Sequence, residues 1–151
     1  MAEIGRIIRY SLLTNRALCY NIFFSGIIGA ATLTMAWFVQ PVLMYLGTPT
    51  SYYGIIWTAL NLTEGIAALY SDRVDRYFGM HKMNILILTV IVGGYVALAC
   101  NLTYAGLGIL LVFYIIRGFA TPILKGYINQ MTFSQMRATV LSIRNFIIRL
   151  I

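Results

Sequence analysis

The stretch Ala68-Leu-Tyr-Ser-Asp-Arg-Val-Asp-Arg-Tyr-Phe-Gly79 places a group of charges between two long uncharged runs. No residue from 17 to 63 is charged, and none from 83 to 116 is charged either. An uncharged apolar run of this length is typical of helices that cross the hydrocarbon core of a bilayer. We therefore expect residues 68–79 to form a short polar loop that joins two membrane-buried hairpins.

The composition excludes a soluble globular protein. Of the 151 residues, 60% are hydrophobic and only 10% are charged, whereas a soluble domain carries about 25% charged residues. The formal charge of +7 would indicate nucleic acid or an acidic partner in a soluble protein. In a membrane protein, basic residues instead gather at the cytoplasmic ends of spans and meet anionic lipid. We expect membrane lipid as a partner and no nucleic acid.

The pattern predicts an all-α integral membrane fold. Its transmembrane domain, residues 17–127, would contain four spans at about 17–46, 52–70, 84–100 and 104–127. The connecting turns fall at Gly47-Thr-Pro-Thr-Ser51 and Asn101-Leu-Thr-Tyr104, and Pro41 gives the first span a reason to bend. Residues 1–16 suit an amphipathic helix on the cytoplasmic membrane surface. Residues 128–151 would form a cytoplasmic loop followed by either an interfacial helix or the start of a fifth span.

The basic residues predict the orientation. With the N-terminus inside, all eleven Lys and Arg residues fall in or toward cytoplasmic segments, and the two outer turns have none. This asymmetry is the positive-inside pattern. We expect a multi-pass protein of the cytoplasmic membrane with a cytoplasmic N-terminus and no removable signal peptide, because the first ten residues lack an apolar core followed by a cleavage site.

The charged stretch resembles the loop motif of the major facilitator superfamily of transporters, on Ala68, Asp72, Arg73 and Arg76. The family usually has Gly at the positions of Ala68 and Asp75, and a basic residue at that of Tyr77. The run from Gly29 to Leu43, with its aromatic-x-Gln-Pro, resembles a seventh transmembrane helix of bacterial members. The segment Tyr127-Ile-Asn129, followed by Arg137-Ala-Thr-Val-Leu-Ser142, is similar to the junction between the tenth and eleventh helices.

The resemblance implies most of the carboxy-terminal half of a twelve-helix secondary transporter, from the seventh helix to the start of the eleventh. In that superfamily the path for a small solute lies between two six-helix halves. One incomplete half would be inactive alone, so a separate amino-terminal half is an implied partner. The alternative is a small helical membrane protein that acts as an assembly or interaction partner, alone or as a homo-oligomer.

Glu64 is the only acidic residue within an expected span. An ionisable group at membrane depth costs about 2.5 to 3.5 kcal/mol on insertion scales and marks a functional candidate. Glu64 would either couple protons or contact substrate, or it would be a structural group near the inner face. Arg117, on the fourth span at broadly similar depth, is its expected ion-pair partner.

Further candidates follow from the neighbourhood and the resemblance. Asn61 and Thr121 would face substrate together with Glu64 and Arg117, because the corresponding two helices of the family border the cavity. Trp37, Gln40 and Trp57 would either line that cavity or belong to the outer aromatic belt. By resemblance, Asp72, Arg73 and Arg76 would stabilise one conformational state, and the alternative for them is a plain positive-inside loop.

No residue pattern indicates an enzyme, a metal or a cofactor. Cys19 and Cys100 are expected near opposite faces of the bilayer, and their spacing matches no metal site. We expect neither catalytic residues nor metal ligands.

Overall fold

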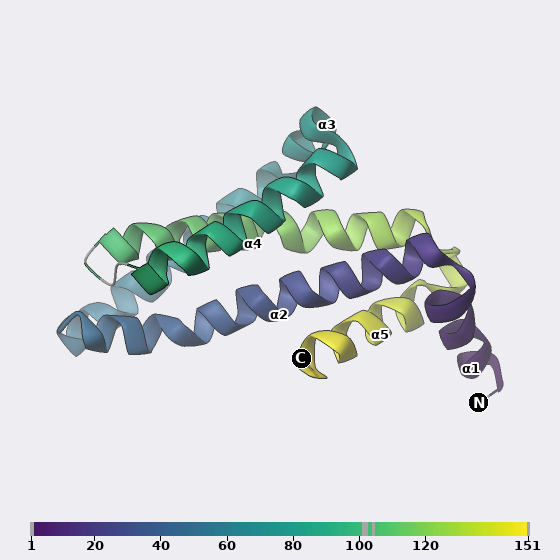
Figure 1. The fold of residues 1–151 in the computed structure, drawn as a ribbon, viewed down its shortest axis with the longest axis horizontal. Coiled ribbons are helices and arrows are strands. Elements are labelled where there is room, and N and C mark those ends of the chain that lie inside the picture. The colour runs from purple at the N-terminus through teal and green to yellow at the C-terminus, as the bar shows by residue number, and fades with distance from the viewer. Residues whose placement is uncertain (1, 101–102, 104, 151) are drawn as a thin grey trace. The chain divides into compact units, whose positions relative to one another are not determined.

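The computed structural model describes residues 2–100, 103 and 105–150, and every regular element among them is helical. The described residues form five α-helices, which are labelled in Figure 1. Their bounds are α1 Ala2–Arg9, α2 Arg16–Tyr45, α3 Tyr53–Cys100, α4 Ala105–Gln130 and α5 Arg137–Leu150. A π-helical segment, Tyr10–Thr14, follows α1, and short 3-10 turns, Thr50–Tyr52 and Ser134–Met136, precede α3 and α5.

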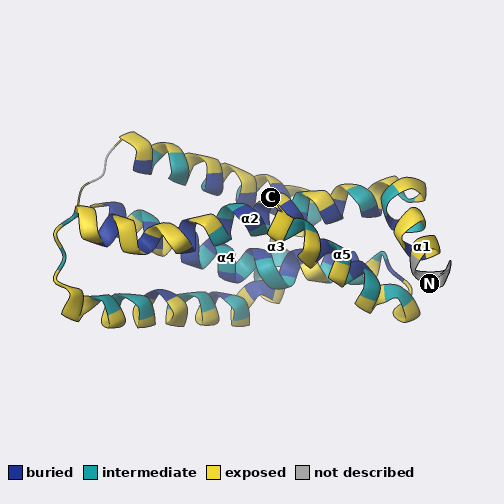
Figure 2. Ribbon diagram, turned by 90° about the horizontal axis from the view of Figure 1, so that it is seen from below, coloured by how far each residue is buried: buried dark blue, intermediate teal, exposed yellow. Residues whose placement is uncertain are grey.

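Three of these helical stretches are long and apolar enough to cross a membrane: Arg16–Tyr45, Thr50–Cys100 and Ala105–Gln130. Many of their exposed side chains are apolar, among them Ile85, Leu88, Val92 and Val96 of α3, and Figure 2 shows exposed faces along the helices. Exposed apolar side chains along a helix are what a lipid environment requires. The all-α prediction is therefore confirmed for the described residues, and three helices could span a membrane, whereas the predicted four spans and partial fifth are not confirmed.

The charged stretch differs from its prediction. Residues 71–78 are helical, and Arg76 Nε donates to the Asp72 carbonyl oxygen at 3.2 Å. Only Gly79 leaves the helical conformation inside α3, with φ 72° and ψ 161°. That region of backbone space is accessible to glycine almost alone. The expected polar loop is thus reduced to one residue, because charged side chains are compatible with a helix and do not by themselves specify a turn.

The chain reverses direction at Gly79. Glu64 and Gly94 lie fifteen residues on either side of this glycine, and both meet α4 within one turn, at Arg117 and Phe113 respectively. In a straight helix they would be about 45 Å apart. α3 therefore consists of two helical arms, residues 53–78 and 80–100, and Figure 1 shows the ribbon folding back.

The turns between helices agree with the sequence where they are described. After α2, Gly47 adopts φ 66°, and the 3-10 turn Thr50–Tyr52 leads into α3, so the reversal expected at 47–51 is confirmed. The turn expected at Asn101–Tyr104 lies outside the described residues apart from Thr103. Pro41 sits inside α2 and Pro122 inside α4, and neither ends its helix.

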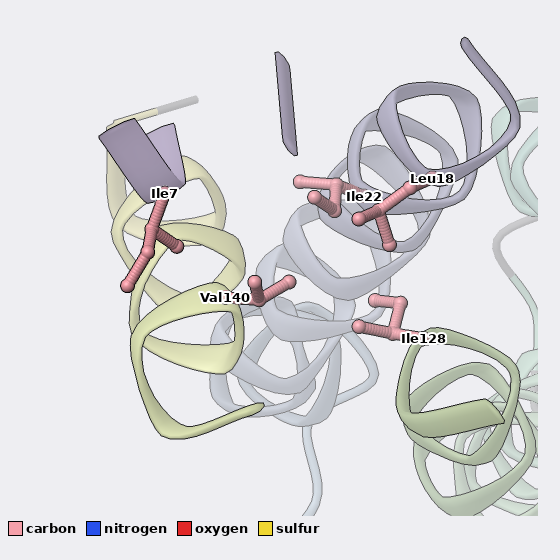
Figure 3. Close-up of a cluster of buried hydrophobic side chains, with 5 residues drawn as sticks. All are labelled: Ile7, Leu18, Ile22, Ile128 and Val140. Carbon is pink, nitrogen blue, oxygen red and sulfur yellow. The ribbon is translucent and has the colours of Figure 1, made fainter. Parts of the chain in front are cut away.

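The helices form two compact units. Unit 1 comprises residues 1–30 and 123–151, and unit 2 comprises residues 31–122. The core of unit 1 joins α1, α2, α4 and α5 through five buried side chains (Figure 3). They are Ile7, Leu18, Ile22, Ile128 and Val140. Within the expected amphipathic segment at 1–16, residues 2–14 are helical, and α1 contributes Ile7 to this core.

In unit 1, α5 lies along the amino-terminal part of α2. A Cβ built on Gly26 would meet Ile147 Cγ2 at 2.7 Å, and one built on Gly29 would meet Ile148 Cδ1 at 2.7 Å. The two helices run in the same direction, since later residues of α5 meet later residues of α2 (Figure 1). Small residues on α2 thus let the branched side chains of α5 approach closely, as is usual between membrane helices.

Candidate functional site

The strongest polar feature of unit 2 is an ion pair between α3 and α4. Arg117 Nε lies 3.1 Å from Glu64 Oε1, and the two side chains are 27% and 24% exposed. The predicted pairing is therefore confirmed. Each charge offsets the cost of removing the other from water, and both side chains keep part of their surface exposed.

Gly118 makes this close approach possible. A Cβ at residue 118 would overlap the backbone oxygen of Glu64 and would lie 2.7 Å from the Cβ of Ala67. Only a residue without a side chain allows the α3 and α4 backbones to come this near. Gly118, the residue after Arg117 in the sequence, therefore sets the distance between the two helices that carry the ion pair.

Sequence reasoning missed Tyr114. Its ring centroid is 5.9 Å from the Arg117 guanidinium carbon, and the side chain is buried. Its hydroxyl has no hydrogen-bond partner among the described residues. The sequence spacing could have identified it, because Tyr114 precedes Arg117 by three positions and therefore shares the same face of α4. The site thus combines a carboxylate, a guanidinium, an aromatic ring and a buried hydroxyl.

The other predicted substrate residues divide into two sets. Asn61 lies one turn before Glu64 on α3, is exposed, and donates from Nδ2 to the Trp57 carbonyl oxygen at 2.7 Å. Thr121, half-buried, lies one turn after Arg117 on α4. Helical spacing therefore aligns these two with the pair.

Trp37 and Gln40 form the second set. Both are exposed on α2, Trp37 at 77%. No contact described for unit 2 joins either of them to Glu64 or Arg117. Their exposure is compatible with an aromatic belt as much as with a cavity wall.

The motif residues Asp72, Arg73 and Arg76 are exposed and make local contacts. The Arg73 guanidinium carbon lies 5.5 Å from the Tyr70 ring centroid, and Arg76 bonds to the Asp72 carbonyl oxygen as described above. These contacts stay within one or two turns of α3. The side chains consequently remain available to groups outside the described chain.

Unit 1 holds a second arginine that the sequence did not distinguish from the other cytoplasmic cations. Arg144 is only 4% exposed. Its Nε donates to Ser25 Oγ on α2, and its Nη1 donates to Asn145 Oδ1 at 3.2 Å. The flanking residues Val140 and Ile147 lie on the same side of α5 and pack inward. The apolar residues at this spacing could have indicated the burial of Arg144 from the sequence, because residues three or four positions apart share one face of a helix.

The described residues contain no group of three His, Cys, Asp or Glu side chains that could hold a metal ion. Cys19 and Cys100 are free thiols. No protein-family model, curated protein or solved structure matches this chain.

Proposed function

We propose that this chain is part of a secondary-active transporter of the major facilitator superfamily that moves a small solute across the cytoplasmic membrane. In this proposal α2, the two arms of α3 and α4 cross the bilayer, with the N-terminus in the cytoplasm. α5 begins a fifth span. A separate amino-terminal half completes the solute path, and the chain alone is inactive.

The observation that carries this proposal is the Glu64–Arg117 pair. In this proposal two oppositely charged groups lie at membrane depth, with Arg117 Nε 3.1 Å from Glu64 Oε1 and each side chain about one-quarter exposed. An ionisable pair at this depth is costly to keep and therefore marks a functional candidate. Protonation of Glu64 would release Arg117 toward an anionic or polar solute, which gives a physical means of coupling proton and solute movement.

Exposed polar residues on the first arm of α3 support the proposal that a second chain packs against this arm. Thr58 and Asn61 are exposed on it, and the hydrogen bonds that they make among the described residues go to their own helix, at the Gly54 and Trp57 carbonyl oxygens. Polar side chains that face outward from a membrane helix are unfavourable against lipid and suit either a water-filled path or a polar helix from another chain. In transporters built from two halves, such faces border the path at the midplane.

The same face of the first arm of α3 supports the second candidate function, which is that of an assembly protein. Gly54 and Gly65 are exposed, and a Cβ at either would meet nothing within 4 Å. Small residues spaced along a membrane helix permit close packing of a second helix. An assembly protein that binds another membrane helix through this arm would use these residues without needing Glu64.

The test is transport in membrane vesicles with an imposed pH gradient. The chain is reconstituted alone and together with a six-helix amino-terminal half, and the assays follow efflux of ethidium and uptake of radiolabelled sugars and amino acids. Each assay is repeated with Glu64→Gln and with the exchanged pair Glu64→Arg, Arg117→Glu. The exchange keeps an ion pair between α3 and α4 but removes the carboxylate from α3.

We expect gradient-driven transport only when both halves are present, and loss of that transport in both variants. Recovery in the exchanged pair would assign a structural role to the ion pair. Absence of transport in all combinations, with stable insertion of the chain and association through the first arm of α3, would favour the assembly protein.

A further inference from the structure

An apolar groove opens on the surface of unit 1. Its volume is about 760 Å³, within the range of roughly 300 to 1,000 Å³ that small-molecule sites occupy. Residues from α1 and the π-helical segment form one wall, Phe23 of α2 contributes another, and α5 supplies the remainder. The α5 residues include Ala138, Ile143, Phe146 and Leu150.

The groove has the length of one lipid chain. It follows α5 from Ala138 to Leu150, a rise of about 18 Å at 1.5 Å per residue. Half of a bilayer's hydrocarbon core is about 15 Å thick. Because α5 runs beside the first part of α2, the groove extends from the start of α5, where α1 packs against it, toward the level of Gly29, which faces Ile148. An acyl chain of a cytoplasmic-leaflet lipid would fit this direction and depth.

The positive charge of unit 1 indicates that the lipid is anionic. In the sequence of residues 1–30 and 123–151 there are seven Lys or Arg residues and one carboxylate, Glu3. Two of the arginines, Arg9 and Arg137, are exposed and directly adjoin the groove residues Ile8 and Ala138 in sequence. Arg137 Nε donates to the Thr132 carbonyl oxygen at 3.2 Å, which fixes its guanidinium near the start of α5.

We infer that this groove binds an anionic phospholipid from the cytoplasmic leaflet. One acyl chain lies against Phe23, Phe146 and Ile147, and the phosphate lies between Arg9 and Arg137. Basic residues beside the cytoplasmic end of a span attract anionic headgroups, and the apolar groove adds the burial that a surface patch lacks. The lipid would tie α1 to α5. This inference stands apart from transport, and it rests on the proposed orientation, in which the chain lies in a membrane with its N-terminus in the cytoplasm.

Native mass spectrometry of the detergent-purified chain tests the inference. The probes are dioleoyl phosphatidylglycerol and dioleoyl phosphatidylcholine, which have the same acyl chains and differ in headgroup charge, with glycerol 3-phosphate as a soluble phosphate. Arg9→Gln removes a rim charge, and Lys82→Gln removes the same charge from an exposed position of α3. Ala138→Phe fills the groove, and Ala99→Phe adds the same side chain at an exposed position of α3.

We expect one phosphatidylglycerol to bind in preference to phosphatidylcholine and to persist without competition from glycerol 3-phosphate. Arg9→Gln should weaken binding about fivefold, the usual contribution of one arginine at an anionic surface, and Ala138→Phe should abolish the preference. Lys82→Gln and Ala99→Phe should leave binding unchanged. Equal binding of both lipids, equal effects of test and control variants, displacement by the soluble phosphate, or a dimer in place of bound lipid would each overturn the inference.

Discussion

Two arginines show how differently the two units hold a cation away from water. In unit 2, Arg117 faces the carboxylate of Glu64 on the neighbouring helix. In unit 1, Arg144 is more deeply buried and donates to a hydroxyl and an amide. The surrounding sequences differ accordingly, because residues 31–122 hold four cations and three carboxylates. Unit 2 is therefore close to charge balance, whereas unit 1 carries a large excess of positive charge.

The helix contacts differ in the same two regions. In unit 2, Gly118 meets the backbone of the facing helix, while in unit 1 Gly26 and Gly29 meet the side chains of Ile147 and Ile148. A side chain can change rotamer to accept an added methyl group, but a backbone has to move with its whole helix. The contact between α3 and α4 is therefore the less adaptable one.

The largest effect is expected for Gly118→Ala. The added methyl group forces α4 away from the Glu64 backbone, so the free energy of unfolding should fall by about 3 kcal/mol, the upper end for overpacking. SDS unfolding in mixed micelles, followed by circular dichroism, measures it. Gly108→Ala is the matched control, because Gly108 lies on the same helix as Gly118 and a Cβ built on it would meet nothing within 4 Å. Equal losses in both variants would contradict the difference in packing.

Gly79→Ala tests the reversal within unit 2. Alanine strains at φ 72°, ψ 161°, so we expect a loss of about 2 kcal/mol in the free energy of unfolding. The same unfolding assay measures this loss. Gly65→Ala serves as the control, since it lies in open space within a regular part of α3. An unchanged stability would mean that the two arms do not depend on this conformation.

A double-mutant cycle on Glu64→Ala and Arg117→Ala isolates the ion pair. Each single variant leaves a partly shielded charge without its partner, so each should lower the free energy of unfolding by about 1.5 kcal/mol, between the values for exposed and buried pairs. The double variant should cost less than the sum of the two singles. Strict additivity would show that the two charges do not stabilise one another.

The smallest effect belongs to Ser25→Ala in unit 1. Arg144 would lose one hydrogen bond but keep its contact with Asn145, so the expected loss is about 1 kcal/mol, as for other polar contacts between membrane helices. Ser142→Ala is the control, because that hydroxyl bonds only to its own helix at the Ala138 carbonyl oxygen. If both serine variants behaved alike, the Ser25 contact would contribute nothing beyond local helix structure.

The ion pair of unit 2 could be predicted from the sequence, because a charged side chain within an apolar helix requires a partner. Glu64 is the only carboxylate within an expected span, and Arg117 is the cation at similar depth, so their pairing was predictable. The position of the chain reversal was predictable to within the charged stretch. Its extent was not, since Asp72, Arg73 and Arg76 can all continue a helix and only Gly79 leaves it.

The sequence by itself determined the long apolar helical stretches, where the charges interrupt them, and which two charges were the candidates for an ion pair. The tertiary structure decided the burial of Arg144 and the groove beside α5. Those features depend on contacts between α2 and α5, with Ser25 and Arg144 separated by 119 positions. Periodicity shows which residues share a face of one helix, but only the packing of a distant helix decides whether that face is buried.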